Sequence, residues 1–135
     1  IFEQLNTVPS ALLGGANRMG AEASIVAWDT GESWVDEMKN TLDSNRHLLV
    51  DRLNEELPAI GIHLPQSTFV AWLDLSNYEP GERPATWMRG LTNVAGQNGL
   101  NFGSEGAGHL RLTFGTSPKI LNQMIDQMVA GLPIL

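Results

Sequence analysis

The longest regular pattern of apolar residues along the chain predicts a helix over residues 32–57. Apolar side chains recur there three, four or seven residues apart, which places them on one stripe of a helix: Val35, Met38, Leu42, Leu49, Leu53 and Leu57. Pro58 and Gly61 then end the pattern. At 1.5 Å per residue this helix is roughly 39 Å long. A helix of that length outruns a small domain, so we expect it to pack against a second domain as well.

Shorter patterns predict three more helices and a small sheet. Helices are expected over 17–28, from Pro84 to Gly96, and from Pro118 to Gly131, with Ser117 as the N-cap of the last. Strands are expected over 62–64, 68–75, 100–103 and 109–114. Residues 68–75 are apolar on both faces, which is typical of a central strand that is buried on both sides. This order of helices and strands is typical of an α+β layer, and residues 1–16 read as a lead-in.

The strand over 109–114 carries the chain's most informative polar residue. Leu110, Leu112 and Phe114 fall on one face, whereas Arg111 falls on the other face with His109 and Thr113. A guanidinium is a flat fork of donors that matches a carboxylate at two points. A glycine loop over 104–108 precedes the strand, and it is typical of a turn that needs positive φ. From position alone, Arg111 either grips a ligand carboxylate, reaches solvent, or pairs with a nearby carboxylate of the chain.

Composition narrows the classes of function. The net charge is −7 with only eight lysines and arginines and no basic cluster, which argues against nucleic acid or an anionic membrane as a partner. No apolar run approaches the roughly 20 residues that span a bilayer. The chain has no cysteine, and its three histidines lack zinc-ligand spacing, so no metal site is expected. The four tryptophans lie on apolar faces and are expected in the core. We expect a cytoplasmic protein and, because the chain begins at Ile1, a piece of a longer one.

Four stretches together resemble the C-terminal end of fold-type-I enzymes that use pyridoxal 5'-phosphate (PLP). They are MGAEASIVAWDTGESWVDEMKNTLDSNRHLL (19–49), STFVAWLDLSNY (67–78), NGLNFGSEGAG (98–108) and FGSEGAGHLRLTFGTSPKIL (102–121). They are similar to the class I/II aminotransferase family, in its cystathionine beta-lyase-like C–S lyase branch. The resemblance implies the α+β small C-terminal domain of the PLP-dependent transferase fold, with an antiparallel or mixed sheet packed by helices. It implies a large-domain remnant or linker over 1–31, an interdomain helix over 32–57 and the small domain over 58–135.

The resemblance also implies roles for individual residues. An arginine at the place of Arg111 holds the substrate α-carboxylate in this family, and Phe102 and Gly103 match a segment near the bound substrate. The family's catalytic lysine, which holds PLP, precedes the matched region. Neither Lys39 nor Lys119 lies in a similar context, so no catalytic or cofactor-binding residue is expected in this chain.

The expected parent is therefore a PLP-dependent C–S β-lyase or aminotransferase of amino-acid metabolism. It would act as a homodimer on an amino-acid substrate. The chain by itself is expected to be inactive and to bind no PLP. The alternative is a stand-alone, non-catalytic interaction module that has kept the small-domain fold.

Overall fold

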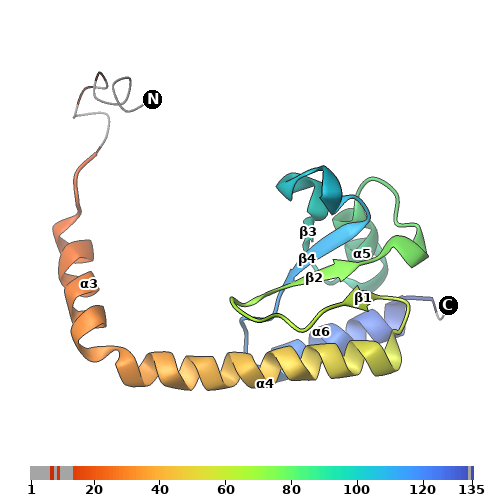
Figure 1. The fold of residues 1–135 in the computed structure, drawn as a ribbon, viewed down its shortest axis with the longest axis horizontal. Helices are drawn as coiled ribbons and strands as arrows, with labels where there is room; N and C mark the ends of the chain where they lie inside the picture. The colour runs from red at the N-terminus through yellow and green to blue at the C-terminus, as the bar shows by residue number, and fades with distance from the viewer. Residues whose placement is uncertain (1–6, 8, 10–13, 134) are drawn as a thin grey trace. The chain divides into compact units, whose positions relative to one another are not determined.

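The computed structural model describes residues 7, 9, 14–133 and 135, and the chain divides into two units, Ile1–Glu37 and Met38–Leu135 (Figure 1). Most of the predicted lead-in over 1–16 lies outside the described residues. Among the described residues, four α-helices accompany one small antiparallel sheet, so the predicted α+β class is confirmed. None of these helices is long and apolar enough to cross a bilayer.

The first unit contains helix α3, Arg18–Thr30, where a helix was predicted over 17–28. The Asn17 side chain caps it by accepting a hydrogen bond from the Met19 backbone N–H at 3.0 Å. No residue of α3 is buried. Trp28 is 89% exposed and Trp34, at the start of the next helix, is 65% exposed, so the prediction that they belong to the core is wrong. The apolar side chains of α3 lie on a helix that buries none of them.

Helix α4, Glu32–Glu56, agrees with the predicted span to within one residue. From Met38 onward α4 belongs to the second unit. The second half of its stripe, Leu49, Leu53 and Leu57, is fully or almost fully buried. Near the middle of the helix the buried side chain is a polar one, Asn45, which the apolar pattern did not predict.

The sheet contains four strands in the order β1-β2-β4-β3, and every pairing is antiparallel. Its two longer strands, β2 and β4, are therefore the internal ones. Their bounds, with those of the two short edge strands, are β1 Gly61–Ile62, β2 Val70–Asp74, β3 Gln97–Asn98 and β4 His109–Thr113. The central position that the sequence predicted for the strand within 68–75 is confirmed.

One face of this sheet is covered by the second part of α4 together with α5 (Pro84–Thr92) and α6 (Pro118–Gly131) (Figure 1). Arg52 ties α4 to α6 by donating to Asn122 at 3.0 Å and to Asp126 at 2.9 Å. Among the described residues, the buried core between these helices and the sheet consists of aliphatic side chains, methionines and the ring of Phe114, and the partly buried rings of Tyr78 and Trp87 pack against it. All of the core therefore lies on a single side of the sheet.

The ends of α5 and α6 follow from their capping residues. Ser117 caps α6 as predicted, because its hydroxyl accepts from the Ile120 N–H at 3.4 Å with Pro118 in the first turn. The prediction that α5 continues to Gly96 is wrong. Asn93 is left-handed, with φ of 59°, and its N–H closes the helix on the Arg89 carbonyl. Gly96 serves close packing instead, since a Cβ there would lie 2.7 Å from the Leu110 side chain.

The predicted strand over 100–103 is also wrong. Residues Gly99–Phe102 form a 3₁₀ turn, and the strand is limited to Gln97–Asn98. The backbones of Gly99 and Gly106 lie against one another, with no space for a Cβ on either. This contact folds the segment into a compact turn, which the alternation of Leu100 and Phe102 does not reveal.

Candidate functional site

The uncovered face of the sheet carries the polar side of β4. Leu110 and Leu112 are fully buried under the helices, while His109 and Arg111 lie on the other face at intermediate exposure, as the sequence predicted. The register pairs Arg111 with Trp72 of β2. Trp72 is 39% exposed, so the predictions that β2 is buried on both faces and that Trp72 is in the core are wrong. The reason is that the helices cover one face only.

Aromatic rings surround the arginine on this open face. The Arg111 Cζ lies 4.9 Å from the centroid of the Phe102 ring, within the range of a cation–π contact. Phe102 meets Trp72 edge to face, with centroids 5.8 Å apart and planes at 76°. Trp72 in turn stacks on His109 at 5.6 Å and 26°. Arg111, Phe102, Trp72 and His109 form one continuous group, which we call the open-face cluster.

The Arg111 side chain makes no hydrogen bond or ion pair within the part of the chain that the structure describes. Pairing with a nearby carboxylate was one of the alternatives for this residue, and the described carboxylates do not provide it. The two arginines of α4 differ, since Arg46 and Arg52 both bond side-chain carboxylates. The N–H donors of Arg111 are thus available to an anion that approaches the open face.

The glycine loop places Phe102 against the arginine. Gly103 and Gly108 have φ of 135° and 73°, which confirms that the loop needs positive φ. The Gly108 carbonyl accepts from the Leu75 N–H at 3.0 Å, and this bond joins the loop to the end of β2. Phe102 therefore lies at the rim of the open face, against Arg111 and Trp72, and Gly103 follows it in the chain.

The backbone that follows β4 is held by Asn45 of α4, a residue that the sequence analysis missed. The Asn45 side-chain amide donates to the carbonyls of Phe114 and Thr116 at 3.0 and 2.7 Å. Asn45 is fully buried, and its Oδ1 has no hydrogen-bond partner among the described residues. The signal in the sequence was an asparagine on an otherwise apolar helix stripe, four residues before Leu49. Such a residue indicates a specific polar contact in a core.

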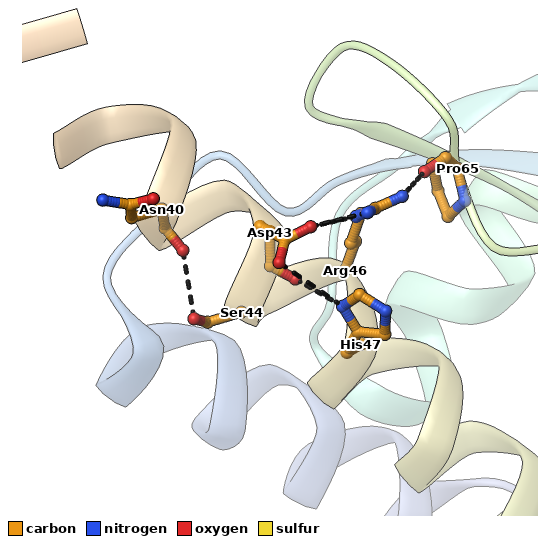
Figure 2. Close-up of polar contacts among 6 residues, drawn as sticks. All are labelled: Asn40, Asp43, Ser44, Arg46, His47 and Pro65. Atoms are coloured by element: carbon orange, nitrogen blue, oxygen red, sulfur yellow. Dashed lines mark hydrogen bonds and ion pairs between the residues drawn. The ribbon is translucent and has the colours of Figure 1, made fainter. Parts of the chain in front are cut away.

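A second polar group connects α4 to the loop before β2. Arg46 donates to the Pro65 carbonyl at 2.8 Å and from Nε to the Asp43 carboxylate at 2.8 Å, while His47 Nδ1 donates to the Asp43 carbonyl at 2.9 Å (Figure 2). A groove of about 370 Å³ lies between this part of α4 and residues 65–69. Arg111 does not line this groove. Of the bonds drawn in Figure 2, only the one from Arg46 to the Pro65 carbonyl reaches the loop, and the others join residues within α4.

At the far end of β2 from the groove, Asp74 faces His109 across the strand pair. The Asp74 carboxylate is bonded by the side chain of Ser76 and accepts from the Ser76 backbone N–H at 2.9 Å. These bonds, with a smaller contribution from the charge of His109, hold the pKa of Asp74 below its usual range. No group of three or more acidic or histidine side chains in the described ranges is arranged to hold a metal ion.

The fold and the site thus define an α+β domain with an arginine on the open face of its sheet, beside a glycine loop. The chain belongs to the aminotransferase class I and II family, whose model matches residues 1–128. It is 32% identical over 137 residues to a Mycobacterium leprae protein provisionally named cystathionine beta-lyase, covering 92% of this chain and 34% of that protein. It is 28% identical to cystathionine beta-lyase PatB of Bacillus subtilis, covering 89% of this chain and 31% of PatB.

The fold comparison agrees with these relatives. The crystal structure of the PLP-bound C–S lyase of Staphylococcus hominis matches with a TM-score of 0.82 and 27% identity, over 87% of this chain and 32% of that chain. The resemblance stated from the sequence, to the C–S lyase-like end of a fold-type-I enzyme, is confirmed. The chain spans about a third of the length of the relatives it matches.

The open face does not by itself form a PLP site. Lys39 and Lys119, the two lysines of the sequence, lie exposed on α4 and in the first turn of α6. The face of β2 and β4 that carries Arg111 presents no lysine amine in the described part of the chain. The residues on this face suit the anionic group of a ligand. Among the described residues the face has no lysine that could hold PLP covalently.

Proposed function

We propose that this chain is the substrate-binding C-terminal domain of a PLP-dependent C–S β-lyase that acts on cystathionine-type substrates, or of an aminotransferase. The observation that carries the proposal is Arg111, a guanidinium on the open sheet face with no anionic partner among the described residues. The named relatives, two cystathionine beta-lyases and a PLP-bound C–S lyase, support the lyase reading.

In this proposal Arg111 holds the α-carboxylate of the amino-acid substrate through two charge-assisted hydrogen bonds. A rigid strand suits this task, because a fixed carboxylate fixes the orientation of the α-carbon. Phe102 and Gly103 lie at the rim of the same face, and in this proposal they form the wall of the substrate site on the side of the glycine loop. PLP, supplied with its lysine by the remainder of the parent protein, would store the electrons released when the α-proton leaves.

The division of the chain follows from the same proposal. Residues 1–31 are a remnant or linker of the large domain, 32–57 an interdomain helix and 58–135 the small domain. The parent acts as a cytoplasmic homodimer in amino-acid metabolism, and the 135-residue chain is inactive without the rest of it.

The test is to express the full open reading frame that contains this segment and to assay it with L-cystathionine. In a β-lyase the Cβ–S bond breaks, the sulfur leaves as a thiol, and water hydrolyses the three-carbon remainder to pyruvate and ammonia. An aminotransferase instead passes the amino group to an added 2-oxo acid and releases no thiol. Release of thiol and pyruvate in equal amounts supports the lyase, and transfer without thiol supports the aminotransferase.

The same gene also tests the alternative. A reading frame that encodes this segment alone, with a product that neither cleaves nor transaminates amino acids, would contradict an enzymatic parent. The stand-alone interaction module would then be the better reading of the fold.

A further inference from the structure

We propose that Phe102, braced by Trp72, is a positioning residue that holds the Arg111 guanidinium in place before a carboxylate binds. The proposal rests on the proposed function for the identity of the anion. It goes beyond that function in assigning to the Phe102 ring an action on Arg111 in addition to its place beside the substrate.

The first observation is the way the arginine is held. An arginine side chain loses considerable rotamer freedom when it is fixed, and a fork that is already fixed loses less on binding. Within the described residues, the Arg111 guanidinium contacts the Phe102 ring, with Cζ 4.9 Å from the ring centroid. A cation–π contact uses the face of the ring and consumes no N–H donor. Phe102 can therefore hold the guanidinium and leave its donors for a carboxylate.

The second observation is that Phe102 is itself held, although it is not in the core. Its side chain is 51% exposed, so burial of apolar surface does not explain where the ring lies. Trp72 contacts it edge to face at 5.8 Å, which is a preferred geometry for two aromatic rings. Trp72 is fixed in turn by its place on β2, opposite Arg111, and by stacking on His109.

The backbone under the ring is equally constrained. Phe102 ends a 3₁₀ turn that Gly99 anchors against the backbone of Gly106. Gly103 follows at φ 135°, a conformation that side-chain-bearing residues rarely adopt. The 3₁₀ turn, Trp72 and the Phe102 ring together support the guanidinium. The glycine loop sets the shape of this support.

The direct test is NMR of the Arg111 side chain in the 135-residue chain, without ligand. A guanidinium over a ring has side-chain proton and Nε resonances displaced by the ring current. We expect that displacement in the wild type, its loss in Phe102→Leu and its retention in Phe102→Tyr, which keeps the π face. Leu100→Ala is the matched control, because Leu100 lies on the same turn and is 46% exposed. Undisplaced Arg111 resonances in the wild type, or the same loss in Leu100→Ala, would overturn the proposal.

The functional test uses the full-length protein. A cation–π contact of ordinary strength corresponds to an expected loss of about two- to thirty-fold in kcat/KM for Phe102→Leu, with recovery in Phe102→Tyr. In an Arg111→Ala background, Phe102→Leu should add almost no further loss. Losses that simply multiply in the double variant would mean that Phe102 acts independently of Arg111, which contradicts positioning.

The two failures are distinguishable. If Arg111→Ala leaves kcat/KM unchanged, the proposed carboxylate role fails, and the NMR result still decides whether Phe102 holds the guanidinium. If Arg111→Ala is damaging and Phe102→Leu is silent in both measurements, the carboxylate role stands and the positioning role is wrong.

Discussion

Trp72 and Arg111 lie directly opposite one another on the antiparallel strands β2 and β4. The same register pairs Leu73 with Leu110, both fully buried on the helix-covered face. Because side chains alternate between the faces of a sheet, a slip of one residue would bury the arginine and expose the leucines. The register that forms the core is therefore also what presents Arg111 on the open face.

On the proposed role, Arg111→Lys in the full-length protein should lower kcat/KM by roughly 30- to 1000-fold, corresponding to about 2–4 kcal/mol. Lysine keeps the charge but loses the planar two-point grip. Arg111→Ala should cost at least as much. Thermal stability should change little, because the Arg111 side chain makes no hydrogen bond or ion pair within the described residues.

The control for this prediction is a substrate analogue whose α-carboxylate is replaced by a neutral amide. The wild-type protein should use it poorly, and the Arg111 variants should lose far less with it than with the acid. Equal losses for the acid and the amide would show that the residue is structural.

The helical part of the fold and the place of Arg111 could be predicted from sequence, because both follow from local periodicity. The α4 stripe and the alternation of β4 each repeat with the period of their element. Ser117 and Pro118 likewise predict the start of α6. The first N–H groups of a helix have no partner within it, so a capping serine and a proline are favoured there, which is a local effect.

The features that could not be predicted from the sequence depend on contacts between distant residues. Trp72 looks like a core residue until the helices are known to cover one face of the sheet. Leu100 and Phe102 alternate like a strand, yet the contact of Gly99 with Gly106 folds them into a turn. Asn45 bonds carbonyls 69 and 71 residues away, so no local pattern specifies its role. The open-face cluster consists of such contacts. The sequence named Arg111 and Phe102 as candidate site residues and put His109 on the face of Arg111, but it did not predict that Trp72 joins them.

We expect the 135-residue chain to form no specific covalent adduct with PLP and to turn over no amino acid. Lys39 and Lys119 lie exposed on helices, away from the strand face that carries Arg111. The check is incubation with PLP, reduction with borohydride and mapping of labelled lysines by mass spectrometry. Stoichiometric labelling of one of these lysines, accompanied by turnover, would refute the prediction.

Asn45→Ala should lower the free energy of unfolding by about 1–3 kcal/mol. The substitution leaves the Thr116 carbonyl without its donor, and an unsatisfied polar group in the interior costs roughly 1–3 kcal/mol. The Phe114 carbonyl loses one of two donors, because it keeps the bond from the Thr116 backbone N–H at 2.8 Å. Urea denaturation measures the change, and Ser44→Ala, on the exposed side of the same helix, is the matched control. A loss no larger than that of the control would mean that the two bonds contribute nothing to stability.

Asp74 should make stability depend on pH in the acid range. Its pKa is lowered in the folded chain by the bonds from Ser76, so it contributes stability above the unfolded value, near 3.9, and loses it as pH falls through the folded value. Asp74→Asn should therefore be less stable than the wild type by about 1 kcal/mol at pH 7, with a difference that shrinks below about pH 4. Urea titrations of both proteins from pH 7 to pH 2.5 provide the comparison, and two curves that stay parallel throughout would rule this contribution out.

The exposed apolar side chains of α3 should drive self-association of the 135-residue chain. Met19, Ile25, Val26 and Trp28 are each more than half exposed, and apolar surface gathered on one helix usually marks an interface. Light scattering should detect dimers or larger species, and Trp28→Ser, which removes the most exposed of these side chains, should shift them toward monomer. Ser24→Ala on the same helix is the control and should leave the distribution unchanged. If the wild type is instead a clean monomer whose α3 amides are strongly protected from hydrogen exchange, these side chains are buried within the single chain in solution and the prediction is wrong.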